Sequence, residues 1–199
     1  ANEGEFLHYK HINSVPESIL TDKIRVIMED DSGTLWFGGV GGASYFNILD
    51  KGFKHIKHIP NEINSLIDKQ TRAIFEDSRG LVWVGTENGI TSVDRVNKVY
   101  THYNSKIASH FGDEVTAIIE DRQGNMWFGY YDLGITVFNP ETQKVSFFKH
   151  DPSNTNSIPH NRIREFFLDS KGNIWIGTQQ GIAVYSPPTG KFLRFKHHV

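Results

Sequence analysis

The stretch EDSRGLVWVGTENGITSVD, residues 76–94, combines an acidic turn, a tryptophan and two glycines, and three variants of it occur elsewhere in the chain. They are MEDDSGTLWFGGVGGASYFN at 28–47, IEDRQGNMWFGYYDLGITVFN at 119–139 and FLDSKGNIWIGTQQGIAVYS at 167–186. All four tryptophans of the chain fall at the same place in these copies, about 45 residues apart. Repetition at this period is typical of solenoids, propellers and helical arrays, whose units pack mainly on their neighbours. The chain is therefore predicted to be an array.

Composition and charge exclude several classes of protein. With 38% hydrophobic and 22% charged residues, the chain has the balance of a globular protein. A net charge of −2 without long blocks of one sign disfavours binding to nucleic acid or to an anionic membrane. The lack of cysteine excludes disulfides, thiolate metal sites and a cysteine nucleophile. No apolar run reaches the roughly 20 residues that span a bilayer, and residues 1–20 do not resemble a signal peptide, so any export signal or anchor is expected outside this sequence.

Each unit is predicted to form four short antiparallel strands joined by tight turns. In the second unit, residues 71–77 and 81–86 are rich in β-branched and aromatic side chains, and residues 90–94 and 99–103 alternate between polar and apolar. An acidic residue and a glycine recur in the first turn: Asp31 with Gly33, Asp77 with Gly80, Asp121 with Gly124, and Asp169 with Gly172. This pair suits a hairpin turn, because the carboxylate accepts backbone hydrogen bonds and glycine adopts positive φ. A calcium loop is the alternative, but the ligand spacing of an EF-hand is missing.

The second strand of each unit carries a tryptophan and, two residues later, a glycine. The pairs are Trp36 and Gly38, Trp83 and Gly85, Trp127 and Gly129, and Trp175 and Gly177. The tryptophans are predicted to fill the space between adjacent sheets, while the glycines allow a neighbouring backbone to approach closely. The alternative, a platform for stacking sugars, requires exposed rings.

Four-stranded units of this length predict an all-β fold of the β-propeller type, with four four-stranded antiparallel blades in a single partial domain over residues 1–199. The blades are expected at about 19–58, 66–103, 113–149 and 158–197. Residues 5–11, EFLHYKH, are similar to the last strand of a unit and are predicted to be an extra outer strand from a preceding blade. Exposed blade faces are expected to support self-association, with two copies forming an eight-bladed ring.

The repeated pattern D-x-x-G-x-[LVIM]-W-[FVI]-G, followed by G-[IA], resembles the two-component regulator propeller repeat. The first unit departs from it at GGVGGA. This family occurs in the periplasmic sensor regions of hybrid two-component proteins of gut bacteria. The resemblance implies part of a larger propeller of the seven-bladed type, without catalytic activity or cofactor, that binds glycan-derived oligosaccharides in the periplasm and signals to a histidine kinase. Neither a kinase nor a receiver is encoded in these residues.

Candidate ligand contacts are expected where the innermost strands begin, because the loops from strand four to one and from strand two to three share that face of a propeller. Arg25, Arg72 and Arg164, with Thr116 in the third unit, occupy one position of the innermost strand. The arginines are predicted to grip acidic groups of a glycan; alternatively they pair with Glu29, Glu76 and other acids of the same strands, or are solvated. The loops from strand two to three add further candidates: Glu87, Asn88, Tyr130, Tyr131, Asp132, Gln179 and Gln180. Tyrosine rings beside acids and amides suit a sugar.

Two other functions remain open from the residues. A propeller glycosidase or lyase would need a non-repeating set of catalytic side chains, and no carboxylate pair stands out. Seven of the ten histidines fall on or after predicted outer strands, so no metal site is predicted. A protein-interaction scaffold is the second alternative. Saturable binding of an oligosaccharide without turnover would distinguish the sensor from both.

Overall fold

The computed structural model describes residues 6–47, 49 and 52–195, and these residues form four sheets of four strands each. Blade 1 consists of β1 (Ile24–Glu29), β2 (Leu35–Gly39), β3 (Gly42–Phe46) and β4 (Lys54–Lys57). Blade 2 consists of β5 (Thr71–Glu76), β6 (Val82–Thr86), β7 (Gly89–Asp94) and β8 (Val99–Tyr103). Blade 3 consists of β9 (Val115–Glu120), β10 (Met126–Tyr130), β11 (Ile135–Phe138) and β12 (Val145–Phe148). Blade 4 consists of β13 (Ile163–Leu168), β14 (Ile174–Thr178), β15 (Gly181–Ser186) and β16 (Lys191–Phe195).

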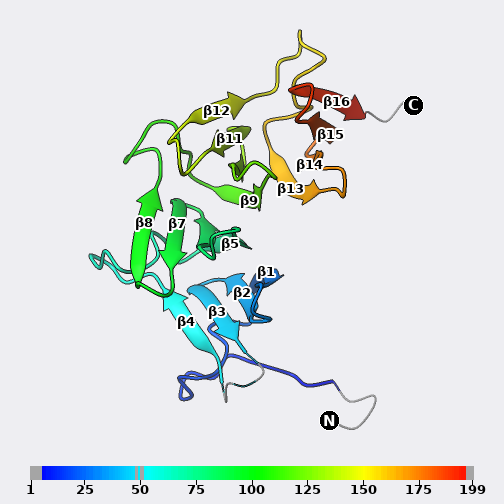
Figure 1. Cartoon of the computed structure of the whole chain (residues 1–199). Coiled ribbons are helices and arrows are strands. Elements are labelled where there is room, and N and C mark those ends of the chain that lie inside the picture. Colours follow the sequence, from blue (N-terminus) through cyan, green and yellow to red (C-terminus); the bar gives the residue numbers. More distant parts are fainter. Residues whose placement is uncertain (1–5, 48, 50–51, 196–199) are drawn as a thin grey trace.

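All strand pairs within a blade are antiparallel and consecutive in sequence, which confirms the predicted all-β fold of four-stranded meanders. Each range expected for a blade contains the four strands of one sheet, although the last range ends in residues outside the described part. The blades follow one another around an arc, with β1, β5, β9 and β13 on its inner side (Figure 1). These innermost strands contact each other in that order, as blades of a propeller do.

Each blade has two faces, because side chains alternate along a strand and residues paired across strands point to the same side. In blade 2, Phe75 pairs with Trp83 on the side turned toward blade 3, and Ile74 pairs with Val84 on the side turned toward blade 1. We call the side turned toward the next blade the trailing face and the side turned toward the preceding blade the leading face.

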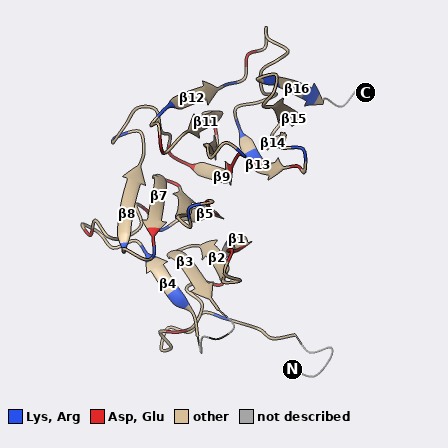
Figure 2. Ribbon diagram, in the orientation of Figure 1, with Lys and Arg blue, Asp and Glu red and all other residues tan. Residues whose placement is uncertain are grey.

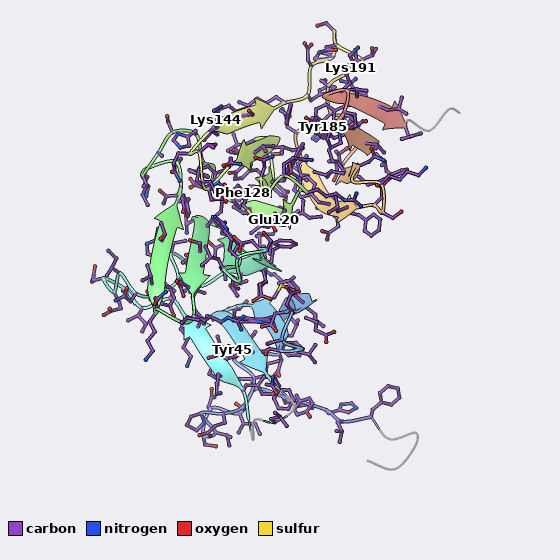
Figure 3. The ribbon with its side chains drawn as sticks, viewed as in Figure 1. Tyr45, Glu120, Phe128, Lys144, Tyr185 and Lys191 are labelled. Atoms are coloured by element: carbon purple, nitrogen blue, oxygen red, sulfur yellow. The ribbon has the colours of Figure 1, made fainter. Side chains whose placement is uncertain are left out.

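The hydrophobic core lies between blades and is divided into three clusters, one at each interface. Between blades 1 and 2, Trp36 of the trailing face packs in one cluster with Ile74 and Val84 of the leading face. Between blades 2 and 3, Trp83 contacts Phe128, with ring centroids 5.5 Å apart; Phe128 is labelled in Figure 3. The same interface is therefore built three times with different side chains.

Three of the four tryptophans are buried as predicted, and the fourth is not. Trp36, Trp83 and Trp127 are at most 1% exposed, whereas Trp175 is 38% exposed. Trp175 lies on the trailing face of blade 4, beyond which the described residues contain no further blade, so only its own sheet covers it. Its ring stacks on Phe195, with centroids 5.9 Å apart.

The recurring aspartate holds both the first turn and the tryptophan. Asp77 accepts hydrogen bonds from the backbone amides of Arg79 and Leu81, each at 3.0 Å, and from the indole nitrogen of Trp83 at 2.7 Å. The indoles of the other three tryptophans donate in the same way to Asp30, Asp121 and Asp169. No group of three or more His, Asp or Glu side chains in the described residues is arranged to hold a metal ion.

In blade 1 the prediction named the wrong aspartate of this turn. Asp30, rather than Asp31, is buried, bonds the turn amides and accepts from Trp36 at 2.9 Å. The reason is the spacing, because the bonding aspartate always stands three residues before the glycine and six before the tryptophan. The exposed Asp31 donates its backbone amide to Glu76 of blade 2 instead.

Arg95 joins blades 1 and 2 from the start of the turn between β7 and β8. Its guanidinium bonds to Asp30 at 2.7 Å, pairs with Glu76, and lies 5.3 Å from the centroid of the Trp36 ring. Figure 2 shows that charged residues of both signs are distributed over all four blades. This mixture of both signs is consistent with the near-neutral net charge of the chain.

We expect Asp30 to make stability depend on acid pH. Burial alone would raise the pKa of Asp30, but hydrogen bonds from Ser32, Trp36, Thr34 and Arg95 together outweigh it and lower the pKa to about 2. A lowered pKa stabilises the fold above the ordinary value of 3.8, and this contribution is lost as the pH falls toward 2. In urea titrations, the stability difference between wild type and Asp30→Asn should shrink by about 2 kcal/mol over this range. A difference that stays constant would contradict the assignment.

The predicted extra outer strand at residues 5–11 is not formed in its described part, residues 6–11, because no strand lies beside it to complete a ladder. One contact of this segment is nevertheless similar to a contact that an outer strand makes with the next blade. The Tyr9 ring packs against Phe46 and Phe53 of blade 1, with centroids 6.0 and 5.4 Å apart. Tyr103 of blade 2 packs on Phe138 of blade 3 in a corresponding way. The described residues include no helix able to cross a membrane.

Candidate functional site

The candidate contacts lie on one face of the arc, where the innermost strands begin. We call this region the loop rim: the turns at 40–41, 87–88, 131–134 and 179–180, with loop residues 68–70, 113–114 and 160–162. Backbone hydrogen bonds tie each turn to the loop beside it. Glu114 donates to the carbonyl of Glu87, Tyr131 to that of Glu114, and Gln179 to that of Arg162, each at 3.0 Å. The rim is therefore held by the main chain across successive blades.

Two of the predicted arginines meet one predicted acid between blades 1 and 2. Arg72 bonds to Glu87 at 2.7 Å, and Arg25 of the neighbouring blade approaches the same carboxylate oxygen at 3.4 Å. The acid that these two arginines meet is Glu87, in the turn between β6 and β7, whereas Glu76 pairs with Arg95. All three side chains are about one third exposed, so the group remains accessible at the rim.

The remaining polar candidates are partly engaged with one another. Asn88 donates to Asp68 at 2.9 Å, and Arg164 of β13 bonds to the side chain of Gln179. Gln180 is exposed, and its backbone amide donates to Thr178. Thr116, at the arginine position of blade 3, bonds the carbonyl oxygens of Gly129 and Ile163 and therefore serves the packing of blades 3 and 4.

Tyr131, Asp132 and Arg162 form the most compact group of the rim, between blades 3 and 4. The Arg162 guanidinium carbon lies 3.8 Å from the centroid of the Tyr131 ring, and Arg162 pairs with Asp132 at 3.1 Å. Sequence reasoning missed Arg162 because it compared the second residue of each innermost strand. Arg162 immediately precedes β13, at a place where the other units carry Lys23, Gln70 and Glu114. The sequence signal that could have identified Arg162 is that this position differs among the four units.

Tyr130 does not offer a surface to a ligand, contrary to prediction. Its side chain is 1% exposed and belongs to the core cluster with Phe111 and Phe128. Burial raises the pKa of its hydroxyl. The sequence places Tyr130 and Tyr131 side by side, but alternation along the chain turns one inward and the other toward the rim.

A pocket of about 210 Å³ adjoins this group and is lined by Ser105, Asp113, Glu114, Tyr131, Asp132 and Leu133. Asp113 accepts a hydrogen bond from Ser105 at 3.0 Å through one carboxylate oxygen, while its other oxygen is buried without a hydrogen-bond partner. The pocket thus combines a tyrosine ring, three carboxylates and an unsatisfied acceptor. Hydroxyl donors beside an apolar C–H surface would match it.

A second cavity of about 400 Å³ is lined by Trp127 and Lys144 of blade 3 and by Tyr185 of blade 4. Figure 3 labels Lys144 and Tyr185. Trp127 and Phe148 both line it, and their rings stack with centroids 5.6 Å apart. The pKa of Tyr185 is raised by burial. This cavity lacks the buried unsatisfied acceptor of the rim pocket, which favours the rim as the candidate site.

Comparison with known proteins finds a family model that matches three of the four repeats. Residues 65–88, 109–132 and 157–180 match the model of a family described as "Two component regulator propeller". A curated relative, "Histidine kinase P4" of Formosa agariphila, is 31% identical over 93 residues, which are 41% of this chain and 7% of that protein. The chain thus spans only a small part of this relative.

Solved structures share the architecture. The extracellular domain of a putative hybrid two component system from B. thetaiotaomicron matches with a TM-score of 0.76 and 26% identity, over 90% of this chain and 24% of that one. A catalytically inactive virginiamycin B lyase from Staphylococcus aureus matches with a TM-score of 0.66 and 18% identity, over 90% of this chain and 58% of the lyase. The lyase shows the fold alone, whereas the first structure relates the chain to extracellular domains of signalling proteins.

Proposed function

We propose that the chain is part of a periplasmic sensor domain that binds a glycan-derived oligosaccharide without catalysing a reaction on it, because three of its repeats match the two-component regulator propeller model. The relation to the extracellular domain of a hybrid two-component system supports the sensor role. The parent protein would pass the signal to a histidine kinase, in keeping with the curated relative.

The pocket beside Tyr131 is the observation that carries the binding part of this proposal. A sugar ring placed there would stack its C–H face on Tyr131 and donate hydroxyl hydrogens to Asp113, Glu114 or Asp132. Arg162 would hold the tyrosine ring in place through its contact with the ring face. Arg25, Arg72 and Glu87 do not line this pocket, but the Glu87 carbonyl accepts from the amide of the lining residue Glu114, so this group would contact further units of a longer, acidic oligosaccharide.

The proposal predicts that Tyr131→Ala weakens oligosaccharide binding at least about tenfold, the effect of losing one stacking partner worth about 1.4 kcal/mol. Isothermal titration calorimetry with a panel of neutral, uronate-containing and sulfated oligosaccharides measures it. Tyr131→Phe should retain most of the affinity because the ring remains. Tyr100→Ala, on β8 and away from the rim, is the control and should bind as wild type does.

The same panel tests the absence of catalysis. After long incubation, chromatography and mass spectrometry should recover each oligosaccharide unchanged. Shortened or unsaturated products would instead identify a glycosidase or lyase. A protein that binds none of the panel would overturn the sensor proposal and leave the scaffold alternative.

A further inference from the structure

We propose, on the basis of the function proposed above, that the rim pocket beside Tyr131 selects a sugar unit that carries a protonated amine. Such a unit is an amino sugar whose nitrogen is not acetylated. Three features of the molecule support this specificity: the charge of the pocket lining, one buried carboxylate oxygen, and the loop that leads into β9.

The pocket lining carries negative charge that the protein only partly neutralises. Asp113, Glu114 and Asp132 each contribute a carboxylate, and the described residues that line the pocket include no Lys or Arg. Arg162, beside the pocket, pairs with Asp132 at 3.1 Å. Within the described part of the chain, Asp113 and Glu114 form no ion pair. The pocket should therefore attract a cationic group and repel an acidic one.

One carboxylate oxygen of Asp113 lacks a hydrogen-bond donor. Oδ2 of Asp113 accepts from the Ser105 hydroxyl at 3.0 Å, while Oδ1 is buried and accepts from no group of the described protein. A buried acceptor without a donor costs free energy, and a charged donor recovers more of this cost than a neutral hydroxyl does. An ammonium group has three N–H donors and no acceptor, so it could serve Asp113 and Glu114 together.

The Tyr131 ring favours the same kind of ligand. The Arg162 guanidinium carbon lies 3.8 Å from the centroid of this ring, so the ring already interacts with one cation. Tyr131 also lines the pocket. An amino sugar would bring both a C–H face and a positive charge to an aromatic ring, and both interactions are favourable.

The loop that leads into β9 differs from the loops that lead into the other innermost strands. In those three loops, one side chain accepts the backbone amide of the residue two positions later, which is the last residue before the strand. The accepting side chains are those of Thr21, Asp68 and His160. Gly112 stands at this position before β9 and has no side chain that could accept the amide of Glu114. The pocket therefore lies where the repeat changes.

Glu114 has a backbone conformation that is unfavourable for a residue with a side chain. Its φ is 51°, in the left-handed region. Its amide donates to the Glu87 carbonyl, and its carbonyl accepts from the Tyr131 amide, each at 3.0 Å. Two turns of the rim thus hold the Glu114 backbone, and its side chain lines the pocket. Backbone strain and gathered like charges both cost stability, and such costs are typical of ligand-binding sites.

The two polar groups of the rim therefore favour opposite charges in the ligand. Arg25 and Arg72 would contact an acidic unit, whereas the pocket beside Tyr131 would contact an amine. An oligosaccharide that carries both kinds of unit would match the rim better than one that is acidic throughout.

Monosaccharide probes test the pocket independently of how sugar units are linked. Titrations of the chain with glucosamine, glucose, N-acetylglucosamine and glucuronate, followed by NMR spectroscopy, compare ligands with the same ring. Glucosamine should bind at least about tenfold more tightly than glucose or N-acetylglucosamine, which is the difference between a charged and a neutral hydrogen bond. Glucuronate should bind most weakly. Ethanolamine, an amine without a sugar ring, should bind more weakly than glucosamine because it cannot stack on Tyr131.

Variants that remove charge but keep shape locate the origin of the preference. Asp113→Asn and Glu114→Gln should each reduce the preference for glucosamine over glucose at least about threefold. Glu114→Gln should leave the melting temperature unchanged or raise it, because it removes one of several like charges. Glu141→Gln is the matched control and should bind as wild type does, since Glu141 is an exposed acid in the turn between β11 and β12 and does not line this pocket.

The outcomes separate this specificity from the sensor proposal. Equal affinity for glucosamine and glucose, or no binding of either, overturns the specificity, and so does a preference that Asp113→Asn and Glu114→Gln both leave unchanged. If oligosaccharides bind while glucosamine is not preferred, only the specificity fails. If glucosamine and ethanolamine bind equally and no oligosaccharide binds, the pocket takes amines outside glycans, and both the amino-sugar specificity and the glycan sensor are overturned.

Discussion

Gly129→Ala is expected to destabilise the chain by about 3 kcal/mol, an overpacking cost at the upper end of the usual range. The added methyl group would lie 2.5 Å from Cγ2 and 2.9 Å from Cβ of Ile163, and 3.1 Å from the Phe166 ring. These atoms belong to blade 4 and sit in the core cluster between blades 3 and 4. Because β-branched Ile163 has little rotamer freedom, relief requires the two blades to move apart.

Gly177→Ala is the matched control, since it makes the same substitution at the same position of the repeat. No atom of another blade lies near the added methyl group, so we expect no loss of stability or a gain of about 0.5 kcal/mol from reduced flexibility of the unfolded chain. Urea unfolding followed by circular dichroism, at a concentration low enough to keep the chain monomeric, measures both variants. Equal effects in the two would mean that the glycines serve the local strand and not the interface.

Asp77→Ala is expected to cost about 4 kcal/mol. The Asp77 side chain is fully buried and accepts hydrogen bonds from two turn amides, from Arg79 and from the Trp83 indole. Its removal leaves a buried indole N–H without a partner and unpaired amides in the turn, and each unsatisfied group costs about 1–3 kcal/mol. Thermal and urea unfolding of wild type and variant measure the difference.

Asp169→Ala makes the same change at the open end of the arc and is expected to cost about 1 kcal/mol. Its indole partner, Trp175, is partly exposed, so water can replace the lost carboxylate there. The local turn bonds are still made, because Asp169 accepts from the backbone amides of Lys171 and Asn173 and from the Asn173 side chain, and these bonds lower its pKa. If Asp169→Ala were as damaging as Asp77→Ala, burial of the tryptophan would not explain the stability effect.

Much of the fold could be predicted because the same sequence pattern occurs four times. The turn aspartate, the tryptophan and the glycine after it recur at fixed sequence spacings in all four units. The structure confirms the antiparallel meander that this pattern predicted. The environment of Trp175 could not be predicted, since burial depends on a neighbouring blade and not on the local sequence. The spacing to Gly33 and Trp36 could have identified Asp30 as the turn aspartate. The prediction chose Asp31 because the two acids are adjacent.

The candidate site was less predictable for a different reason. Comparing equivalent positions of the repeats identifies residues that recur, and this led to Arg25 and Arg72. In the structure both arginines pair with Glu87. Ligand-binding side chains are expected where units differ, as at Arg162 and in the pocket beside Tyr131. Which of two consecutive tyrosines faces outward depends on strand register at the end of β10, where an irregularity between Gly129 and Tyr130 shifts the pairing.

The separation of the core into interfaces bears on how such a chain can change over evolution. In the described residues the main strand contacts between blades join blades that are adjacent in sequence, and the glycines of the second strands meet corresponding positions of the next blade. Duplication or loss of one whole unit of about 45 residues would therefore leave every other junction intact, whereas inserting two or three residues within a strand would disrupt two junctions at once. Arrays of this kind are expected to vary in length by complete units, and their diversity in recognition to accumulate in the connecting loops.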